Sequence, residues 1–441
     1  MQVLGQPPIT YSYDNASRLT SMSQASKTMT VTYDGDGRRS TLTLPNGIVT
    51  TYSYNRAGEL TGIVYTQDGQ PLGDLQYTYD TVGQRTGVAG SMARTNFPRS
   101  VSSATYDEGN SLTSWDGQAI LSDANGNILS DGFHTYSWDA RNHLVAVDSG
   151  TTAAFSYDAL GRRAAKAVNG VTTNVVYSFI NPVQEITGGT VSANFLTGGV
   201  DEYFVRSDAQ GDIFYLADAL GSTLGLADIN GNIQTQYTYD PFGATTSTGL
   251  PTSNTVGFTG REMDNTGLYY YRARYYEPSM GRFLSEDPIG FKADMNVYAY
   301  AFSSPVNFVD PSGLNGTKKP DNAIYKICCK KGKFSFCEGP NASMAGNDWV
   351  GDCAREHERQ HINDFNSGKF TPLTNCADPA NDGQIVNVNG PDKNAIECSG
   401  YSKEVDCLSH APSRAGDSID ARKKFVNDQK SHYCGAAGGC K

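Results

Sequence analysis

A tyrosine followed by an aspartate recurs along the first 160 residues of the chain, and this repeat limits the possible folds more than any other feature. Successive occurrences lie 19 to 32 residues apart, and in two of them asparagine or tryptophan replaces one member. A loose period of this length is typical of small units that stack, because no single unit buries its apolar face alone. The occurrences begin at Tyr13, Tyr33, Tyr54, Tyr79, Tyr106, Trp138 and Tyr157.

Each repeat has the pattern of a β-hairpin. Residues 51–54 alternate threonine or serine with tyrosine, residues 55–58 read Asn-Arg-Ala-Gly, and residues 59–63 resume an extended pattern. Alternation on both sides of such a turn predicts two antiparallel strands. The aromatic ring then covers the neighbouring hairpin, while the aspartate binds amides of its own turn. We therefore predict a mainly β fold of stacked hairpins, with an ordinary tyrosine-rich sandwich as the alternative.

Composition changes abruptly near residue 314. All nine cysteines lie in the last 114 residues, whereas 23 of the 26 tyrosines lie before residue 315. Residues 315–441 hold 17 basic and 16 acidic side chains, so the rest of the chain, with 18 against 30, carries a net charge of −12. Two chain segments of different chemistry are therefore joined at this point.

Several classes of protein are excluded by composition. No run of 18 apolar residues occurs, so we expect no transmembrane helix. The first residues have neither a basic region nor an apolar stretch, so no secretory signal is visible, and the start in mid-pattern suggests a piece of a longer chain. A net charge of −11 is a poor match to a protein that wraps nucleic acid non-specifically.

The segments from residue 214 to residue 314 resemble a known family. Quoted as they stand, they are FYLADALGS at 214–222, YDPFG at 239–243, FTGRE at 258–262, GLYYYRARYY at 267–276, GRFLSEDPIG at 281–290, NVYAY at 296–300 and NFVDPSGL at 307–314. They are similar to late repeats of the YD-repeat (RHS) family and to its RHS repeat-associated core domain over about 80 positions. The resemblance implies a spiral β-shell fragment at residues 1–235, a core domain that plugs it at 236–314, and a variable toxin domain at 315–441.

The same resemblance implies that the chain cleaves itself between Leu314 and Asn315. Asp287 and Asp310 would take part, with Arg282 nearby. Two carboxyl groups that share a site do not both ionise cheaply, so one keeps a proton while the other activates water. The alternative is that both Asp-Pro-x-Gly segments are only tight turns, in which the aspartate binds its own backbone.

The tail carries a sharp local motif, His357-Glu358-Arg359-Gln360-His361. On a helix, histidines four residues apart project from one face and bind one Zn²⁺, while the glutamate between them serves as general base to a metal-bound water. The apolar spacing of Val350, Ala354 and Phe365 places both histidines on the buried stripe of such a helix. The alternative is a solvated helix with paired charges.

A catalytic zinc site needs a third protein ligand. A second predicted helix places Glu397, Tyr401 and Glu404 on one face, so Glu397 is the expected third ligand and Glu404 its substitute. Tyr401 would then stabilise an oxyanion, or else pack in the core. The positions three and six residues after His361 hold Asp364 and Ser367, which excludes the metzincin pattern.

The tail's nine cysteines have the density of a disulfide scaffold. No two of them are separated by two residues, which disfavours a structural zinc site. We predict four disulfides, with the ninth cysteine unpaired or joined to another chain, and an oxidising compartment such as the periplasm or the extracellular space.

Together these features predict a secreted polymorphic toxin that releases a small α+β zincin-like metallopeptidase. The zinc motif predicts a protein or peptide substrate, and the family resemblance implies a secretion apparatus and a cognate immunity protein as partners. No nucleic-acid partner is expected, because the tail's net charge of +1 forms no basic stripe and the zinc-deaminase pattern is absent. The alternatives are a cysteine-stapled binding module and a toxin that acts on nucleic acid.

Overall fold

The computed structural model describes residues 3, 5–16, 18–292, 294–314, 316–317, 325–330 and 333–338. The chain divides into two compact units, Met1–Lys319 and Pro320–Lys441. The second unit is described only by β30 (Tyr325–Lys330) and β31 (Lys333–Glu338), which pair antiparallel. No helix in the described part of the chain is long and apolar enough to cross a membrane.

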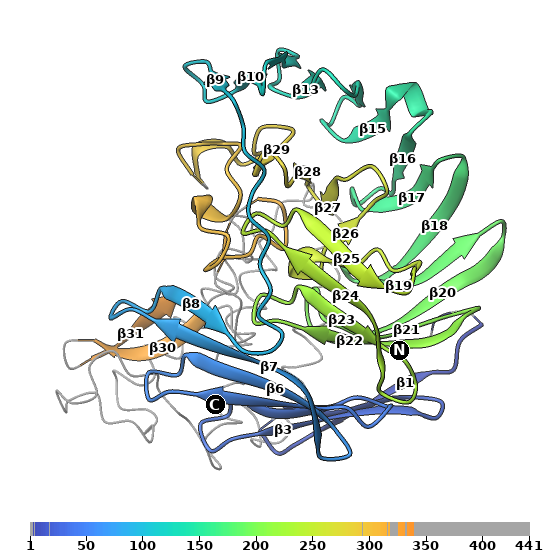
Figure 1. Cartoon of the computed structure of the whole chain (residues 1–441), viewed down its shortest axis with the longest axis vertical. Helices are drawn as coiled ribbons and strands as arrows, with labels where there is room; N and C mark the ends of the chain where they lie inside the picture. Colours follow the sequence, from blue (N-terminus) through green and yellow to red (C-terminus); the bar gives the residue numbers. More distant parts are fainter. Residues whose placement is uncertain are drawn as a thin grey trace, which may run out of the picture. The chain divides into compact units, whose positions relative to one another are not determined.

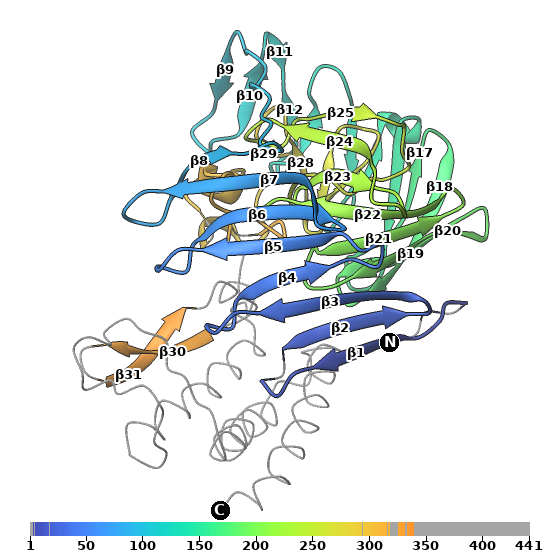
Figure 2. The same ribbon diagram turned by 60° about the horizontal axis from the view of Figure 1, so that its bottom comes forward.

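The first unit begins with an eight-stranded antiparallel sheet in which each strand pairs with the next along the chain (Figures 1 and 2). Its strands are β1 (Ile9–Tyr13), β2 (Leu19–Gln24), β3 (Lys27–Tyr33), β4 (Arg39–Thr43), β5 (Val49–Tyr54), β6 (Leu60–Gln67), β7 (Gln70–Tyr79) and β8 (Arg85–Ala89).

Two small sheets follow, and we call residues 104–130, which hold them, the wall hairpins. The first consists of β9 (Ala104–Tyr106), β10 (Leu112–Trp115) and β11 (Gln118–Ala119). The second consists of β12 (Leu121–Ser122) and β13 (Ile128–Ser130). Neither sheet shares a strand ladder with the larger sheets on either side of it in sequence.

A twelve-stranded antiparallel sheet comes next, again with neighbours in chain order. Its strands are β14 (Tyr136–Trp138), β15 (Leu144–Val147), β16 (Ala153–Tyr157), β17 (Arg163–Val168), β18 (Val171–Ser178), β19 (Asn181–Thr187), β20 (Thr190–Thr197), β21 (Tyr203–Asp208), β22 (Gly211–Ala217), β23 (Thr223–Ala227), β24 (Ile233–Tyr239) and β25 (Thr245–Gly249).

The remaining part of this unit, residues 254–317, is named the core segment here. It forms a four-stranded sheet of β26 (Glu262–Met263), β27 (Tyr269–Tyr271), β28 (Arg274–Glu277) and β29 (Arg282–Phe283). Almost every side chain of these strands is buried. Four short 3₁₀ turns complete the described structure: Asp148–Gly150, Phe258–Gly260, Gly290–Lys292 and Ala301–Ser303.

The repeated Tyr-Asp pair works as the sequence predicts. At the turn between β3 and β4, Asp34 Oδ1 accepts the amides of Asp36 and Arg38, and Asp34 Oδ2 accepts the Arg38 side chain at 2.7 Å. The Arg38 guanidinium then lies over the ring of Tyr54, one hairpin further along, at 4.7 Å from its centroid. Arg18 over Tyr33 and Arg162 over Tyr177 repeat the arrangement. Each turn is thus tied to the next hairpin, which confirms the mainly β fold of stacked hairpins.

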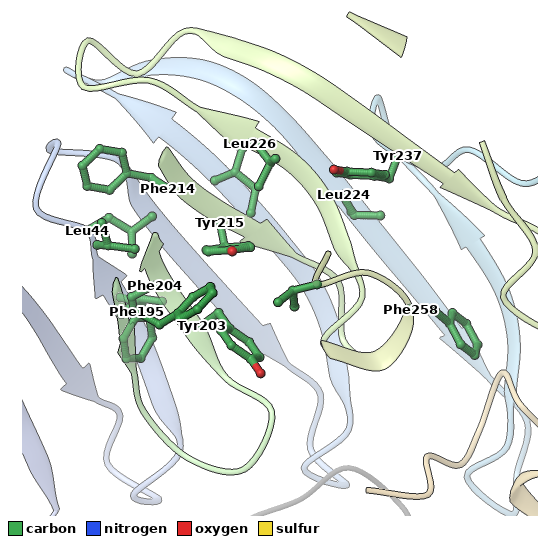
Figure 3. Close-up of a cluster of buried hydrophobic side chains, with 14 of the residues drawn as sticks. Leu44, Phe195, Tyr203, Phe204, Phe214, Tyr215, Leu224, Leu226, Tyr237 and Phe258 are labelled. Atoms are coloured by element: carbon green, nitrogen blue, oxygen red, sulfur yellow. The ribbon is translucent and has the colours of Figure 1, made fainter. Parts of the chain in front are cut away.

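The two large sheets share one apolar core. Leu44, which follows β4, lies among Phe195, Phe204 and Phe214 of the twelve-stranded sheet (Figure 3). Tyr65 of β6 is buried and donates its hydroxyl to the carbonyl oxygen of Ala217 at 2.6 Å. The core segment extends this cluster with further aromatic side chains, so the sheets and the core segment stabilise one another through common buried area.

Buried ion pairs also hold the core segment against the twelve-stranded sheet, and the sequence alone did not indicate them. Arg163 of β17 is fully buried and binds Glu262 at 2.7 Å and Asp264, both of the core segment. Lys166 lies 3.3 Å from Asp264. Because a buried charge is tolerated only when paired, these contacts fix how the core segment is seated.

Candidate functional site

The two aspartates singled out in the sequence meet on one guanidinium. Arg274 Nη2 lies 2.9 Å from Asp287 Oδ2 and 3.5 Å from Asp310 Oδ2. All three residues are buried: the exposed fraction is 3% for Arg274, 6% for Asp287 and 1% for Asp310. The structure therefore brings together two carboxylates that lie far apart in the sequence.

Strand and turn geometry sets the position of each group. Arg274 opens β28, whereas Asp287 follows β29 and donates its amide to the carbonyl oxygen of Val297 at 3.0 Å. Asp287 Oδ1 accepts the amide of Ile289 at 2.9 Å, and Asp310 Oδ1 accepts the amide of Leu314 at 3.0 Å. Both Asp-Pro-x-Gly segments are thus tight turns, which was the alternative interpretation of the sequence. Each turn also directs a carboxylate oxygen toward Arg274.

Burial alters the acidity of this group of side chains. It raises the pKa of Asp287 to about 6, against the opposing effect of Arg274, and the Asp310 charge raises it further. Burial likewise lowers the pKa of Arg274, which the two carboxylates offset in part. A carboxyl group with a pKa near 6 is partly protonated around neutral pH, as a general acid requires.

Three consecutive residues, 272–274, donate hydrogen bonds to the backbone just before Leu314. The Arg272 side chain donates to the carbonyl oxygen of Pro311, the Ala273 amide donates to that of Ser312 at 3.1 Å, and Arg274 Nε donates to that of Gly313. Gly313 has a φ of +72°, and a Cβ there would lie 3.1 Å from Arg274 N and closer than 3.0 Å to the carbonyl oxygen of Tyr271. Only glycine fits this position without a shift of the backbone.

Arg282 does not take the place that the resemblance implied. Among the described residues, its ion pairs with Asp287 and Asp310 are absent, and its guanidinium lies over the rings of Tyr106 and Tyr298 instead. The arginine on both aspartates is Arg274. The sequence held one signal for it, an arginine amid the tyrosines of 269–276, but only the fold decides which arginine reaches the carboxylates.

The predicted zinc site cannot be compared with the fold. His357, Glu358, His361, Glu397, Tyr401 and Glu404 all lie outside the residues that the structure describes. Within the described ranges, no group of three or more histidine, cysteine, aspartate or glutamate side chains has a metal-binding arrangement. Zinc binding and the disulfides therefore stay predictions, as do the domain boundaries and the oxidising compartment.

Comparison with known families gives one match that covers more than half of the chain. Residues 49–306 match the Teneurin YD-shell family. Among solved structures, a Photorhabdus luminescens Tc holotoxin pore superposes with a TM-score of 0.55 at 20% identity, covering 72% of this chain and 21% of that one. At that identity the likeness concerns the fold alone.

Curated relatives are named as toxins or nucleases. The tRNA3(Ser)-specific nuclease WapA of Bacillus spizizenii is 35% identical over 254 residues, which is 54% of this chain and 11% of the relative. The double-stranded DNA deaminase toxin A of Burkholderia cenocepacia is 28% identical over 326 residues, which is 60% of this chain and 22% of the relative. The chain thus spans about a tenth to a fifth of the length of these relatives.

These names overturn three predictions made from the tail. The relatives are called a tRNA nuclease and a DNA deaminase, so the predictions of a zinc metallopeptidase, of a protein or peptide substrate and of no nucleic-acid partner are wrong. The error has a physical origin. A five-residue motif specifies chemistry only when a third ligand and an open coordination position are also in place, and sequence spacing does not establish either. Likewise, a net charge near zero does not exclude a local basic groove.

Proposed function

Because this chain belongs to the Teneurin YD-shell family, we propose that it is a portion of a polymorphic toxin that is secreted or delivered to a target cell. In this proposal, residues 1–314 form part of the shell and its core. They cleave the bond between Leu314 and Asn315 and so release the segment that follows. The released segment acts on nucleic acid. Support for the toxin shell comes from the family match and from the toxin relatives.

The observation that carries the cleavage proposal is the placement of Arg274. Its guanidinium contacts both aspartates and also the Gly313 carbonyl, one residue before the expected cleavage point. A segment held at three successive carbonyls next to two carboxyl groups has the proximity that hydrolysis of one peptide bond requires.

The chemistry follows the division of roles between the aspartates. Asp310 takes a proton from a water molecule, whose oxygen adds to the carbonyl carbon of Leu314. The bond from that carbon to the Asn315 nitrogen then breaks, and Asp287 protonates the departing amine. The raised pKa of Asp287 supports its assignment as the acid. Asp310 accepts hydrogen bonds from the Leu314 amide at 3.0 Å and from Ser312 Oγ at 3.2 Å, so its carboxylate is held beside the residue whose carbonyl carbon is attacked, which supports the role of base.

Cleavage is tested by purifying the full chain with Asp287→Asn and Asp310→Asn beside it. We expect the parent to yield two fragments, the smaller beginning at Asn315 by N-terminal sequencing, and both variants to remain intact. Asp228→Asn is a matched control, because Asp228 accepts the amides of Asn230 and Asn232 in a similar turn but lies away from Arg274. Normal processing of the Asp287 variant contradicts the proposal.

The action on nucleic acid rests on the relatives' names and needs a separate test. Parent protein after processing and intact Asp287→Asn protein are each incubated with labelled tRNA and with double-stranded DNA. Strand breaks or base conversions that the processed protein alone produces support the proposal. Unaltered RNA and DNA, from a preparation shown to be processed, contradict it.

A further inference from the structure

Arg282 is a buried cation that the proposed chemistry does not use. Its exposed fraction is 6%, no carboxylate among the described residues lies within ion-pair distance, and its Nη1 has no hydrogen-bond partner. The guanidinium lies over two rings, 5.2 Å from the centroid of Tyr106 and 4.8 Å from that of Tyr298, and its Nη2 donates to the carbonyl oxygen of Asn110 at 2.6 Å. Such a group is costly to bury, so its position calls for an explanation.

Two of these contacts come from the wall hairpins. Tyr106 ends β9 and Asn110 lies in the turn that follows it, whereas Arg282 belongs to the core segment. Further polar contacts join the same two parts. The Ile128 amide donates to the carbonyl oxygen of Leu284 at 2.9 Å, and the Tyr298 hydroxyl donates to that of Gly126 at 3.1 Å.

Apolar contacts reinforce this docking. Leu112, Ile120 and Ile128 of the wall hairpins are buried in a second cluster, which also contains Tyr275 and Leu284 of the core segment. Tyr275 follows Arg274 in β28, and Leu284 comes three residues before Asp287. The wall hairpins therefore press on the strands that carry the candidate catalytic groups.

A short chain of hydrogen bonds leads from Tyr298 to those groups. The Phe283 amide donates to the carbonyl oxygen of Tyr298 at 3.0 Å. The neighbouring carbonyl, that of Val297, accepts both the Asp287 amide at 3.0 Å and Arg274 Nη1 at 2.8 Å. A shift of Tyr298 consequently moves the one carbonyl that orients both Asp287 and Arg274.

The wall hairpins are joined to the twelve-stranded sheet by side-chain contacts and not by a strand ladder. They share no strand ladder with either large sheet, and every side chain of β9 is exposed. Phe97, in the strand-free segment that leads into them, is 96% exposed. Undocking breaks the contacts with the core segment and those with the twelve-stranded sheet, which are a shared apolar cluster and the hydrogen bond from Trp138 Nε1 to the carbonyl oxygen of Ile128 at 2.8 Å. It leaves the strand ladders of both large sheets paired.

The geometry points to Arg282 as a positioning residue that couples docking of the wall hairpins to self-cleavage. When the hairpins are docked, Arg282 and Tyr298 hold the Asp287 turn in the arrangement that cleavage requires. When they are not, Val297 is released and the two aspartates lose their common orientation. Cleavage therefore occurs only when the wall hairpins are docked on the core segment. This inference rests on the proposed function, because it concerns control of the same bond cleavage.

The first test measures the first-order rate of processing in the full chain. Loss of the stacked cation displaces groups at the site, so Arg282→Gln should slow cleavage by about tenfold or more, in line with the cost of small misplacements. Arg282→Lys keeps a cation over the rings and should recover a large part of the rate. Arg18→Gln is the matched control, since Arg18 stacks on Tyr33 in the same way at a repeat away from the site, and we expect the parent's rate.

The outcomes separate the two proposals. If Arg282→Gln cleaves at the parent's rate while Asp287→Asn stays intact, the coupling is wrong and the proposed function stands. If Asp287→Asn is itself processed, the proposed function fails. Should Arg282→Gln not fold, Tyr298→Phe replaces it, because this change removes the hydroxyl that donates to Gly126, together with its bond to Glu286 Oε1 at 3.2 Å, and keeps the ring. Unchanged cleavage in the folded Tyr298 variant also overturns the coupling.

A second measurement does not depend on cleavage. In the Asp287→Asn background, hydrogen exchange is followed for peptides that cover residues 283–287 and 297–298. We expect faster exchange when Arg282→Gln is added and no change when Arg18→Gln is added. Identical exchange in all three proteins overturns the coupling, whatever the state of the scissile bond.

Discussion

The hydrogen bonds that hold the carbonyl groups of residues 311–313 lead to a specific prediction for Gly313→Ala. Gly313 has a φ of +72°, a region that costs an alanine about 1–2 kcal/mol. The new Cβ would also come closer than 3.0 Å to the carbonyl oxygen of Tyr271, a contact that real Cβ atoms do not make. The segment must therefore retreat from Arg274, and a displacement on the order of 1 Å at a reacting group costs roughly 10²-fold in rate.

We accordingly expect Gly313→Ala to slow processing by about 100-fold, which equals about 2.7 kcal/mol of activation free energy. The assay follows the disappearance of full-length chain on denaturing gels, with thermal unfolding measured in parallel. Gly69→Ala is the matched control: Gly69 has a φ of +76°, but a Cβ there meets nothing within 4 Å. It should lower stability by the cost of the φ region alone and leave the cleavage rate unchanged.

Two results would refute this reasoning. If Gly313→Ala is processed as fast as the parent, the close approach to Tyr271 does not position the scissile segment. If Gly69→Ala slows processing as much as Gly313→Ala does, the effect arises from general destabilisation rather than from displacement of residues 311–313.

Three further predictions follow from the same contacts. The cleavage rate should fall about tenfold for each pH unit above about 6, because the protonated form of Asp287 is lost there; time courses between pH 5 and 8 test this, and a rate that rises through pH 6 would assign Asp287 as the base. Arg274→Lys should remain folded but lose most processing, since one ammonium group does not replace a guanidinium that contacts two carboxylates and two carbonyls; processing at the parent's rate would contradict the assignment. Arg163→Met should lower the free energy of unfolding in urea by about 3–5 kcal/mol, because it leaves two buried carboxylates without their main partner, whereas Arg162→Met, at a partly exposed pair, should cost no more than about 1 kcal/mol.

Local chemistry was predictable from the sequence because its causes lie within a few residues. The turn at Asp34 is set by one carboxylate and the amides two and four residues later, and the strands on either side follow from alternation. The two Asp-Pro-x-Gly segments were recognisable for the same reason. By contrast, the peptidase activity predicted from the tail is contradicted by the names of the relatives, because a short motif does not by itself specify the reaction that a domain performs.

The sequence alone predicted that the repeats form stacked β-hairpins, and it singled out Asp287 and Asp310 as a pair, with two tight turns as the alternative. The contact of these aspartates with Arg274 and not with Arg282 depends on the tertiary structure, because the residues next to each arginine do not specify which carboxylates it reaches. The pairing of β28 with β27 and with β29 places Arg274 toward the carboxylates, while Arg282 lies against the wall hairpins. The physical reason is that burial of a charge depends on partners far away along the chain, which local patterns do not specify.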